Sequence, residues 1–249
     1  ANRSAIRETL DFLLSEGRWG ELIEFAKVLG LYWRHATDPQ VGVETLKSLL
    51  AREEVLAMDP ETLADLRLIL GGLYRMIGQA RAAKVQYDAA WNVFQDSTDV
   101  QGRLRSLFGL ASYYHETGDI QQERPLLMAA DELAAEHDQP IMQAYARLRL
   151  GHTFDGDEDS NLARDSFVQC LILSQEAGSE AFEAAALAAL SLMDLREGRY
   201  ERATEQLKAS LSLQDKNHDL YAMADSKLLL ARAWIGMGDP DRARTLLQE

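Results

Sequence analysis

One leucine recurs every 40 residues along most of this 249-residue chain. The five copies, 40 apart by subtraction, are Leu70, Leu110, Leu150, Leu190 and Leu230. The next residue is always small: Gly71, Ala111, Gly151, Ser191 or Ala231. Four residues after the leucine stand Tyr74, Tyr114, Phe154, Asp194 and Trp234, aromatic in four of the five copies. A fixed period of this length is typical of proteins built from stacked repeats, and it constrains the fold more than any other feature.

Three more positions keep the same spacing. Eight residues after the leucine stand Gly78, Gly118, Glu158, Gly198 and Gly238; thirteen after it stand Ala83, Glu123, Ala163, Ala203 and Ala243. Seventeen after it stand Tyr87, Leu127, Phe167, Leu207 and Leu247, and twenty after it stand Ala90, Ala130, Cys170 and Ser210. The leucine and the aromatic residue share one face of a first helix, the glycine ends that helix, and a second helix follows. Each repeat is therefore predicted to be a helical hairpin.

The composition supports a purely helical chain. There are 39 Leu but only 8 Val and 8 Ile, and β-branched residues are the ones that favour strands. We expect helices near 60–77, 79–96, 100–117, 120–137, 140–154, 159–177, 180–197, 199–217, 219–236 and 239–249. The predicted fold class is all-α: a right-handed α-solenoid of stacked antiparallel helical hairpins.

The first 59 residues are less regular. Their apolar spacing predicts helices near 4–15, 18–35 and 40–57. Gly17 precedes Gly78 by 61 residues rather than 80, so the register breaks there. We predict degenerate helical hairpins over 1–59 that cap the solenoid, and five repeats over 60–249, the last one truncated. Both ends indicate an excised piece of a larger protein; the alternative is a complete chain with a processed start.

The repeat resembles the tetratricopeptide family. The motif Leu70-Gly71, Tyr74, Gly78, Ala83, Tyr87 and Ala90 matches that family's signature in full, and the other copies match in part. The resemblance covers roughly 64–249 and, at 40 residues, is similar to the long-repeat variety. A weaker resemblance, carried by the turn Gly17-Arg18-Trp19 and the following Tyr32-Trp33, is to the helical arms of bacterial signal-transduction ATPases and related transcription regulators.

The charge and the cysteine content exclude several classes. The 26 Lys and Arg against 40 Asp and Glu give a net charge of −14, which repels a phosphate backbone or an anionic membrane. No apolar run is long enough to span a bilayer. The single Cys170 excludes an internal disulfide and suits a reducing compartment. We expect a cytoplasmic protein that binds neither nucleic acid nor membrane through this segment, with Cys170 a buried structural thiol.

Catalytic and metal-binding motifs are absent from the sequence. No P-loop, zincin helix or nucleophile elbow occurs, so no catalytic residue, cofactor or metal is predicted, and the chain is not expected to be an enzyme. Asp155, Asp157 and Asp159 alternate like the start of a calcium loop, but Ser166 stands where the bidentate Glu belongs. A solvated hairpin turn is the preferred interpretation.

The remaining candidate surface is the concave groove that the tetratricopeptide resemblance implies. Its groove positions map onto Arg75, Arg105, Phe108, His115, Tyr145, His152, Arg196 and Arg232. Four Arg and two His in an acidic protein could hold a carboxylate or phosphate group. Equally, they could be solvated residues paired with Asp65, Glu116 and Asp225. The carboxylate clamp of chaperone-binding relatives is missing, because its positions hold Leu68, Gly72 and Arg75.

These features predict a non-enzymatic interaction domain. It would bind a protein, a peptide or a small effector in the groove and act as the sensor or regulatory arm of a larger bacterial signalling protein or transcriptional regulator. The main alternative is a free-standing scaffold for protein–protein interaction; a peptide-pheromone receptor and an enzyme are further alternatives. Oligomers could form through the solenoid ends.

Overall fold

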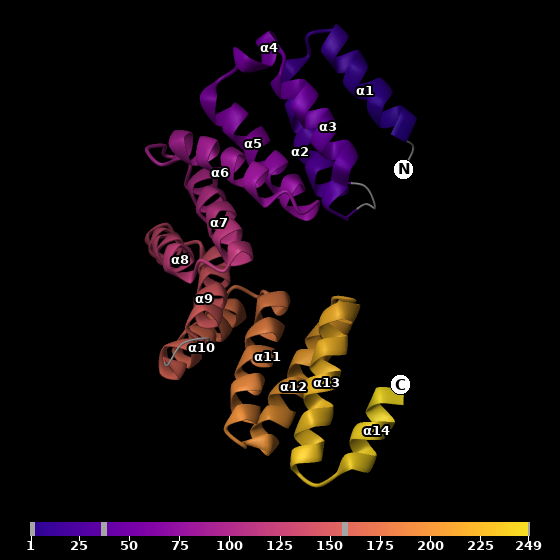
Figure 1. The fold of residues 1–249 in the computed structure, drawn as a ribbon, viewed down its shortest axis with the longest axis vertical. Helices are drawn as coiled ribbons and strands as arrows, with labels where there is room; N and C mark the ends of the chain where they lie inside the picture. The colour runs from indigo at the N-terminus through magenta and orange to yellow at the C-terminus, as the bar shows by residue number, and fades with distance from the viewer. Residues whose placement is uncertain (1–2, 36–38, 156–158, 249) are drawn as a thin grey trace. The chain divides into compact units, whose positions relative to one another are not determined.

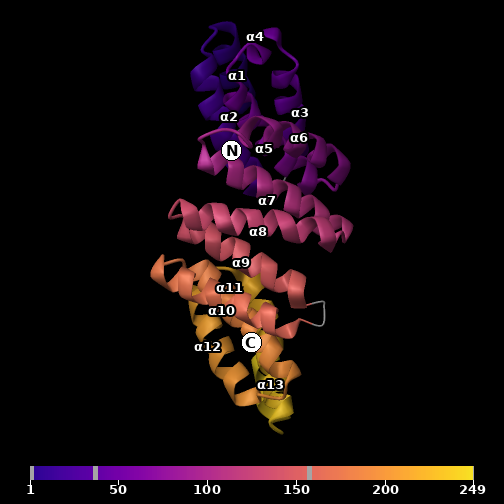
Figure 2. The same ribbon diagram turned by 90° about the vertical axis from the view of Figure 1, so that its left-hand side faces the viewer.

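A computed structural model describes residues 3–35, 39–155 and 159–248 of the chain. Within these ranges there are fourteen helices and no strand (Figures 1 and 2). The helices are α1 (Arg3–Ser15), α2 (Trp19–His35), α3 (Pro39–Leu50), α4 (Glu53–Leu56), α5 (Pro60–Met76), α6 (Ala80–Phe94), α7 (Val100–Thr117), α8 (Ile120–Glu136), α9 (Pro140–Asp155), α10 (Ser160–Glu176), α11 (Glu180–Arg196), α12 (Tyr200–Lys216), α13 (Leu220–Gly236) and α14 (Pro240–Gln248). The predicted all-α class is confirmed, and from residue 60 onward the helix bounds agree with the expected ones to within two residues at every end.

The chain forms two compact units, Ala1–Leu126 and Leu127–Glu249, which divide inside α8. In the first unit α5 packs against α2, α3, α6 and α7. In the second unit α9 packs on α10, α11 on α12 and α13 on α14, and each of these hairpins also contacts the next. Antiparallel hairpins that contact only their neighbours are the arrangement predicted for a solenoid. The proposed division into residues 1–59 and 60–249 stays a prediction.

The five repeat leucines are all buried. Their exposed fractions are 2% for Leu70, 5% for Leu110, 3% for Leu150, 2% for Leu190 and 3% for Leu230. The residues thirteen positions later are equally buried, from 0% to 2% exposed, including Glu123 at 1%. The repeat positions therefore have equivalent burial in successive hairpins, which is what the sequence register predicted.

The sequence predicted degenerate helical hairpins over 1–59, but it was missed that the hairpin of α2 and α3 is a sixth copy of the repeat motif. Leu29-Gly30 and Trp33 repeat the pattern of Leu70-Gly71 and Tyr74 at a distance of 41 residues, and Leu29 and Trp33 are 4% and 3% exposed. Gly42 stands where the other copies have Ala or Glu. A Cβ added to it would lie 2.7 Å from the ring of Trp33, so the larger aromatic residue accounts for the smaller partner.

The helix expected over 40–57 is wrong: α3 ends at Leu50 and α4 begins at Glu53. Between them Arg52 has extended backbone angles, φ −89° and ψ 135°. Leu49 and Val55 are 3% and 1% exposed. In one continuous helix, residues six apart would point in directions about 120° apart. The break lets both side chains enter the core.

In the α5–α6 and α9–α10 hairpins, a glycine and an aromatic residue set the helix separation. A Cβ added to Gly71 would lie 2.5 Å from Tyr87, and one added to Gly109 would lie 2.6 Å from the same ring, so α5 and α7 both approach it closely. In the second unit a Cβ on Gly151 would lie 2.3 Å from the ring of Phe167. Atoms in real structures do not approach so closely, so any larger residue must displace the ring.

We expect Gly151→Ala to lower the free energy of unfolding by about 1–3 kcal/mol, although Ala is the better helix former by ~1 kcal/mol. The ring of Phe167 is 1% exposed and has no space to move. The double variant Gly151→Ala with Phe167→Leu recreates the small–leucine pairing of Ser191 and Leu207. Urea unfolding of the wild type, the two single variants and the double variant gives a double-mutant cycle. The double variant should be about 1–2 kcal/mol more stable than the summed effects of the two single changes predict. Additive single effects would contradict this account of the contact.

Candidate functional site

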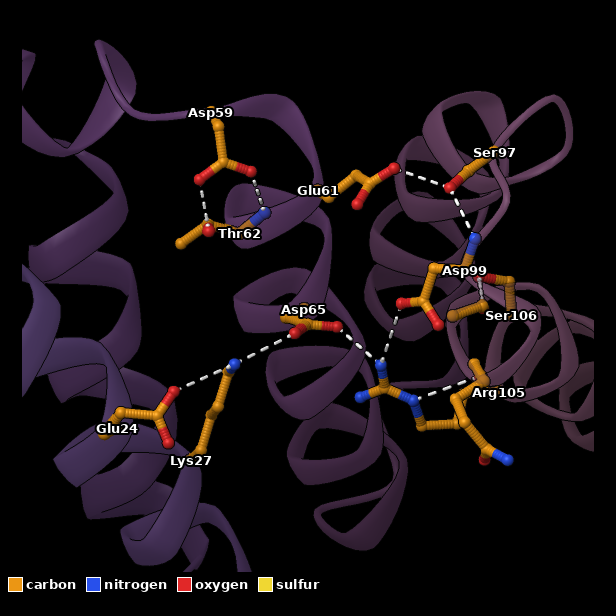
Figure 3. A network of polar contacts seen from close by, with 12 residues as sticks. Glu24, Lys27, Asp59, Glu61, Thr62, Asp65, Ser97, Asp99, Arg105 and Ser106 are labelled. Atoms are coloured by element: carbon orange, nitrogen blue, oxygen red, sulfur yellow. Dashed lines mark hydrogen bonds and ion pairs between the residues drawn. The ribbon is translucent and has the colours of Figure 1, made fainter.

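In the first unit, a row of charged side chains connects three helices that lie side by side. The Lys27 Nζ atom on α2 is 3.1 Å from an Asp65 carboxylate oxygen on α5, and the other Asp65 oxygen is 2.6 Å from Arg105 Nη2 on α7 (Figure 3). Arg105 is also 4.0 Å from Asp99. We call these residues the Lys27–Asp65–Arg105 row. It follows the first helices of three successive hairpins.

The repeat register determines where two members of the row, Asp65 and Arg105, lie. Asp65 and Arg105 each stand five residues before their repeat leucine, so they occupy equivalent positions on α5 and α7. Burial lowers the pKa of Lys27, but its hydrogen bonds to Asp65 and Glu24 outweigh this and raise that pKa above its usual range. The side chains of Lys27 and Arg105 are 36% and 43% exposed. Ion pairs this open to water each stabilise a fold by at most about 1 kcal/mol.

Side-chain hydrogen bonds order the start of α5, which carries Asp65, and the loop before α7, which carries Arg105. Asp59 accepts a hydrogen bond from the Thr62 hydroxyl and one of 2.9 Å from the Thr62 N–H, and these bonds lower the pKa of the Asp59 carboxyl (Figure 3). The Ser97 hydroxyl accepts a bond of 2.9 Å from the Asp99 N–H and donates one of 2.5 Å to Glu61. These bonds connect the start of α5 to the loop before α7 and hold the row in register.

A second kind of ion pair joins consecutive hairpins near their turns. Arg75 Nη1 lies 3.1 Å from Glu116 Oε1 in the first unit, and Arg196 Nη1 lies 2.6 Å from Asp155 Oδ1 in the second. Both pairs join the residue five places after one repeat leucine to the residue six places after the next, with the signs reversed. The register therefore fixes where such a pair forms but not which partner carries the positive charge.

The other predicted groove residues lie in different surroundings. In the first unit Phe108 is only 8% exposed, and His115 Nδ1 is 3.2 Å from the buried Glu123 carboxylate. In the second unit the ring of Tyr145 is 5.6 Å from that of Phe182, and the ring of His152 is 5.0 Å from that of Phe167. Each unit therefore holds four of the eight predicted residues, and most of them contact neighbouring side chains.

Three of the four groove arginines form ion pairs. Arg105 and Arg75 pair with Asp65 and Glu116, two of the three carboxylates that the solvated-pair alternative named. The third, Asp225, forms no ion pair within the part of the chain that the structure describes. Arg232 is exposed and likewise has no ion pair among the described residues. An anionic ligand at the paired arginines would therefore have to compete with carboxylates of the chain itself.

A cluster of charges around a buried carboxylate in the second unit was missed in the sequence. Asp194 occupies the aromatic position of its repeat and is 0% exposed. Its carboxylate lies 2.7 Å from Arg199 Nη2, 2.9 Å from Arg164 Nη1 and 3.2 Å from Arg202 Nε. Glu197 contacts Arg164 and Arg199. We call these five residues the Asp194 cluster. The signal for it in the sequence was Asp194 itself, a carboxylate at the position where the other copies have an aromatic ring.

The Asp194 cluster joins two hairpins. Arg164 comes from α10, Asp194 from α11, and Arg199 and Arg202 from the turn before α12 and from α12 itself. Three guanidinium groups surround two carboxylates, so the buried Asp194 charge is well compensated. The cluster explains why this repeat has no aromatic ring at position 194. Asp194 and Arg164 join the neighbouring hairpins by a charge-assisted contact instead of by ring packing.

The described residues contain neither a metal-binding group nor a membrane-spanning helix. They include no group of three or more His, Cys, Asp or Glu side chains placed to hold a metal ion. Of the acidic turn noted in the sequence, Asp155 and Asp159 are described, while Asp157 lies outside the described residues, as does Glu158. No described helix is both long enough and apolar enough to cross a membrane.

No protein-family model matches the chain, and no curated protein matches its sequence. Solved structures do match its fold. The tetratricopeptide-like repeats of a putative kinesin light chain from Podosopora anserina are 20% identical, with a TM-score of 0.61 over 77% of this chain and 94% of that one. The apo form of RapI is 15% identical, with a TM-score of 0.75 over 91% and 80%. NprR in complex with its cognate peptide NprX is 14% identical, with a TM-score of 0.66 over 99% and 72%.

The chain has the tetratricopeptide-repeat fold. At these identities the likeness concerns the fold alone, and it confirms the family resemblance that the Leu70 motif indicated. In this tetratricopeptide-repeat chain, the Lys27–Asp65–Arg105 row lies on first helices, and the Asp194 cluster lies at a hairpin turn.

We expect Asp194→Asn to lower the free energy of unfolding by about 2 kcal/mol, because three arginines lose a buried counter-charge. The matched control is Glu197→Gln, which changes a 38%-exposed carboxylate of the same cluster and should cost at most about 1 kcal/mol. Urea unfolding of the two variants makes the comparison. Equal effects would mean that burial of Asp194 does not govern the cluster.

We expect Cys170 to resist alkylation in the folded protein. It is 0% exposed, and burial raises its pKa to about 12, so at pH 8 only about one thiol in ten thousand is ionised. Because the unfolded thiol ionises near pH 8.5, stability should fall as pH rises above that value. Cys170→Ala, the residue of the first two copies, should lack this pH dependence. Rapid labelling by iodoacetamide without denaturant would contradict the burial.

Proposed function

We propose that this chain is a non-enzymatic interaction domain that binds a polypeptide segment along its first helices. In this proposal it serves as the sensor or regulatory arm of a larger bacterial signalling protein or transcriptional regulator in the cytoplasm. No cofactor takes part. The observation that carries the proposal is the Lys27–Asp65–Arg105 row, in which charged groups from three successive hairpins are aligned and remain partly open to water.

Partly exposed ion pairs suit exchange with a ligand. Each pair in the row is worth at most about 1 kcal/mol, so a bound peptide can replace an internal partner at little cost in stability. An acidic group of the peptide would bind Arg105, while its N–H groups or basic side chains would bind Asp65. Because Asp65 and Arg105 belong to different hairpins, such a peptide would contact more than one repeat.

The fold comparison supports a peptide as the class of ligand. NprR, whose structure has a TM-score of 0.66 to this chain, was solved with its cognate peptide NprX. A stack of hairpins held by neighbour contacts can change its curvature when a ligand bridges several of them. That change would carry the signal to an attached effector domain.

A free-standing scaffold is the second candidate. It is favoured by the internal pairing of Arg75 with Glu116 and of Arg105 with Asp65, because these arginines already stabilise the stack without a ligand. A scaffold would bind its partners without changing shape. Small-angle X-ray scattering with and without bound peptide distinguishes the two, since only the regulatory arm should change its radius of gyration.

Peptides that bind the wild-type chain can be selected from a displayed random library. We expect these peptides to bind the Arg105→Ala variant about tenfold more weakly. The guanidinium group that would bind their carboxylates is then missing. Arg81→Ala is the matched control, because Arg81 is an exposed arginine on the second helix α6. Fluorescence anisotropy measures the affinities, and melting curves establish that both variants fold. Selected peptides that bind both variants as they bind wild type would place recognition away from the row.

A further inference from the structure

A cleft of about 440 Å³ lies between α1 and α3 in the first unit. Helices α1 and α3 both pack against α2, which leaves a trough between them. Its volume is within the ~300–1,000 Å³ that is typical of ligand-binding clefts. None of the residues of the Lys27–Asp65–Arg105 row, and none of the eight predicted groove residues, lines it. The cleft is therefore a surface that the proposed function leaves unused.

The α1–α3 cleft is lined by two straight helix faces, and five of its ten lining residues are apolar. Ile6, Leu10 and Leu14 follow one another at every fourth residue of α1, and Val41 and Leu49 stand eight residues apart on α3. Eight residues of helix extend about 12 Å, or two turns. A trough of this length matches the apolar stripe of a short helix, whose side chains recur every three to four residues.

The rim of the cleft is acidic at its middle. Asp11 stands beside Leu10 on α1, and Glu44 stands beside Thr45 on α3. Both carboxylates are exposed, and Asp11 has no ion pair among the described residues. One cation, Arg52, lies past the end of α3. The rim therefore carries a net charge of −1, the sum of two Asp or Glu and one Arg, in a chain whose net charge is −14.

We propose that the α1–α3 cleft is a second binding site, which accepts a short amphipathic helix with basic flanks from a partner polypeptide. The apolar stripe of that helix covers the partly exposed Ile6, Leu14 and Val41, and its lysines or arginines lie over Asp11 and Glu44. Two facing walls of helix with a carboxylate on each favour a basic helix over a compact neutral molecule, which would leave both carboxylates unpaired.

The probe is a fluorescein-labelled peptide of about fourteen residues, with leucines at every third or fourth position and lysines between them. Two control peptides have the same length: one has the same residues scrambled so that the leucines share no face, and the other has glutamates in place of lysines. Fluorescence anisotropy with the full 249-residue chain measures binding. The basic amphipathic peptide should bind saturably, and each control should bind at least about tenfold more weakly.

Two kinds of variant locate the site. Ser48→Trp fills the cleft from an exposed wall position and should weaken binding of the basic peptide at least about tenfold. The matched control, Lys47→Trp, adds the same ring at an exposed neighbour that does not line the cleft. The double variant Asp11→Lys with Glu44→Lys changes only exposed residues, so it should fold normally. It should lose the basic peptide and gain the acidic one.

Several outcomes would overturn the proposal: no saturable binding, equal binding of the scrambled peptide, or binding that neither Ser48→Trp nor the double variant alters. Binding of the uncharged probe N-phenyl-1-naphthylamine in the cleft without any binding of the peptide would assign it to a small apolar ligand instead. Arg105→Ala should leave the peptide's affinity unchanged, so failure here is distinguishable from failure of the first-helix proposal.

Discussion

The close approach of the two helices in each hairpin is the contact on which the rest of the structure depends. Where the second helix carries Tyr87 or Phe167, the facing position on the first helix is Gly71 or Gly151; where it carries Leu207, that position is Ser191. A large residue on one side thus goes with a small residue on the other, so the helix separation can stay the same. A constant separation repeated every 40 residues brings equivalent positions of successive first helices into line.

Two polar residues interrupt this regular packing, and each is buried with partners of its own. Glu123 replaces the usual alanine, is 1% exposed and is contacted by His115; Asp194 replaces the usual ring and is contacted by three arginines. A buried carboxylate without partners would cost several kcal/mol, so each substitution requires compensating polar partners. Glu123 and Asp194 therefore make their hairpins different from the other hairpins of the chain.

Much of the fold could be predicted from the sequence, because a few residues define each hairpin. Left-handed glycines such as Gly118, with φ 74°, end the first helices, and prolines such as Pro60 begin others. The α2–α3 hairpin was not recognised as a further copy of the repeat, because its spacing is 41 residues and Gly42 stands at the alanine position.

The break after Leu50 could not be predicted from helical periodicity, since it depends on which faces of Leu49 and Val55 the tertiary core covers. The pairings of the candidate site were only partly predictable. The register shows that Asp65 and Arg105 are equivalent, but a single sequence does not determine which of several nearby carboxylates each arginine contacts. Nor does it reveal that Phe108 is buried.

The Lys27–Asp65–Arg105 row and the Asp194 cluster differ in what a ligand can do to their ion pairs. The arginine and lysine of the Lys27–Asp65–Arg105 row are 43% and 36% exposed, so water already screens their pairs and a competing charge can replace either partner. Asp194 is fully buried, and removing its partners would leave an uncompensated charge. We therefore expect a ligand that bridges hairpins to bind at the Lys27–Asp65–Arg105 row, where the ion pairs are weak and aligned. The Asp194 cluster, with its buried carboxylate, keeps its own two hairpins together.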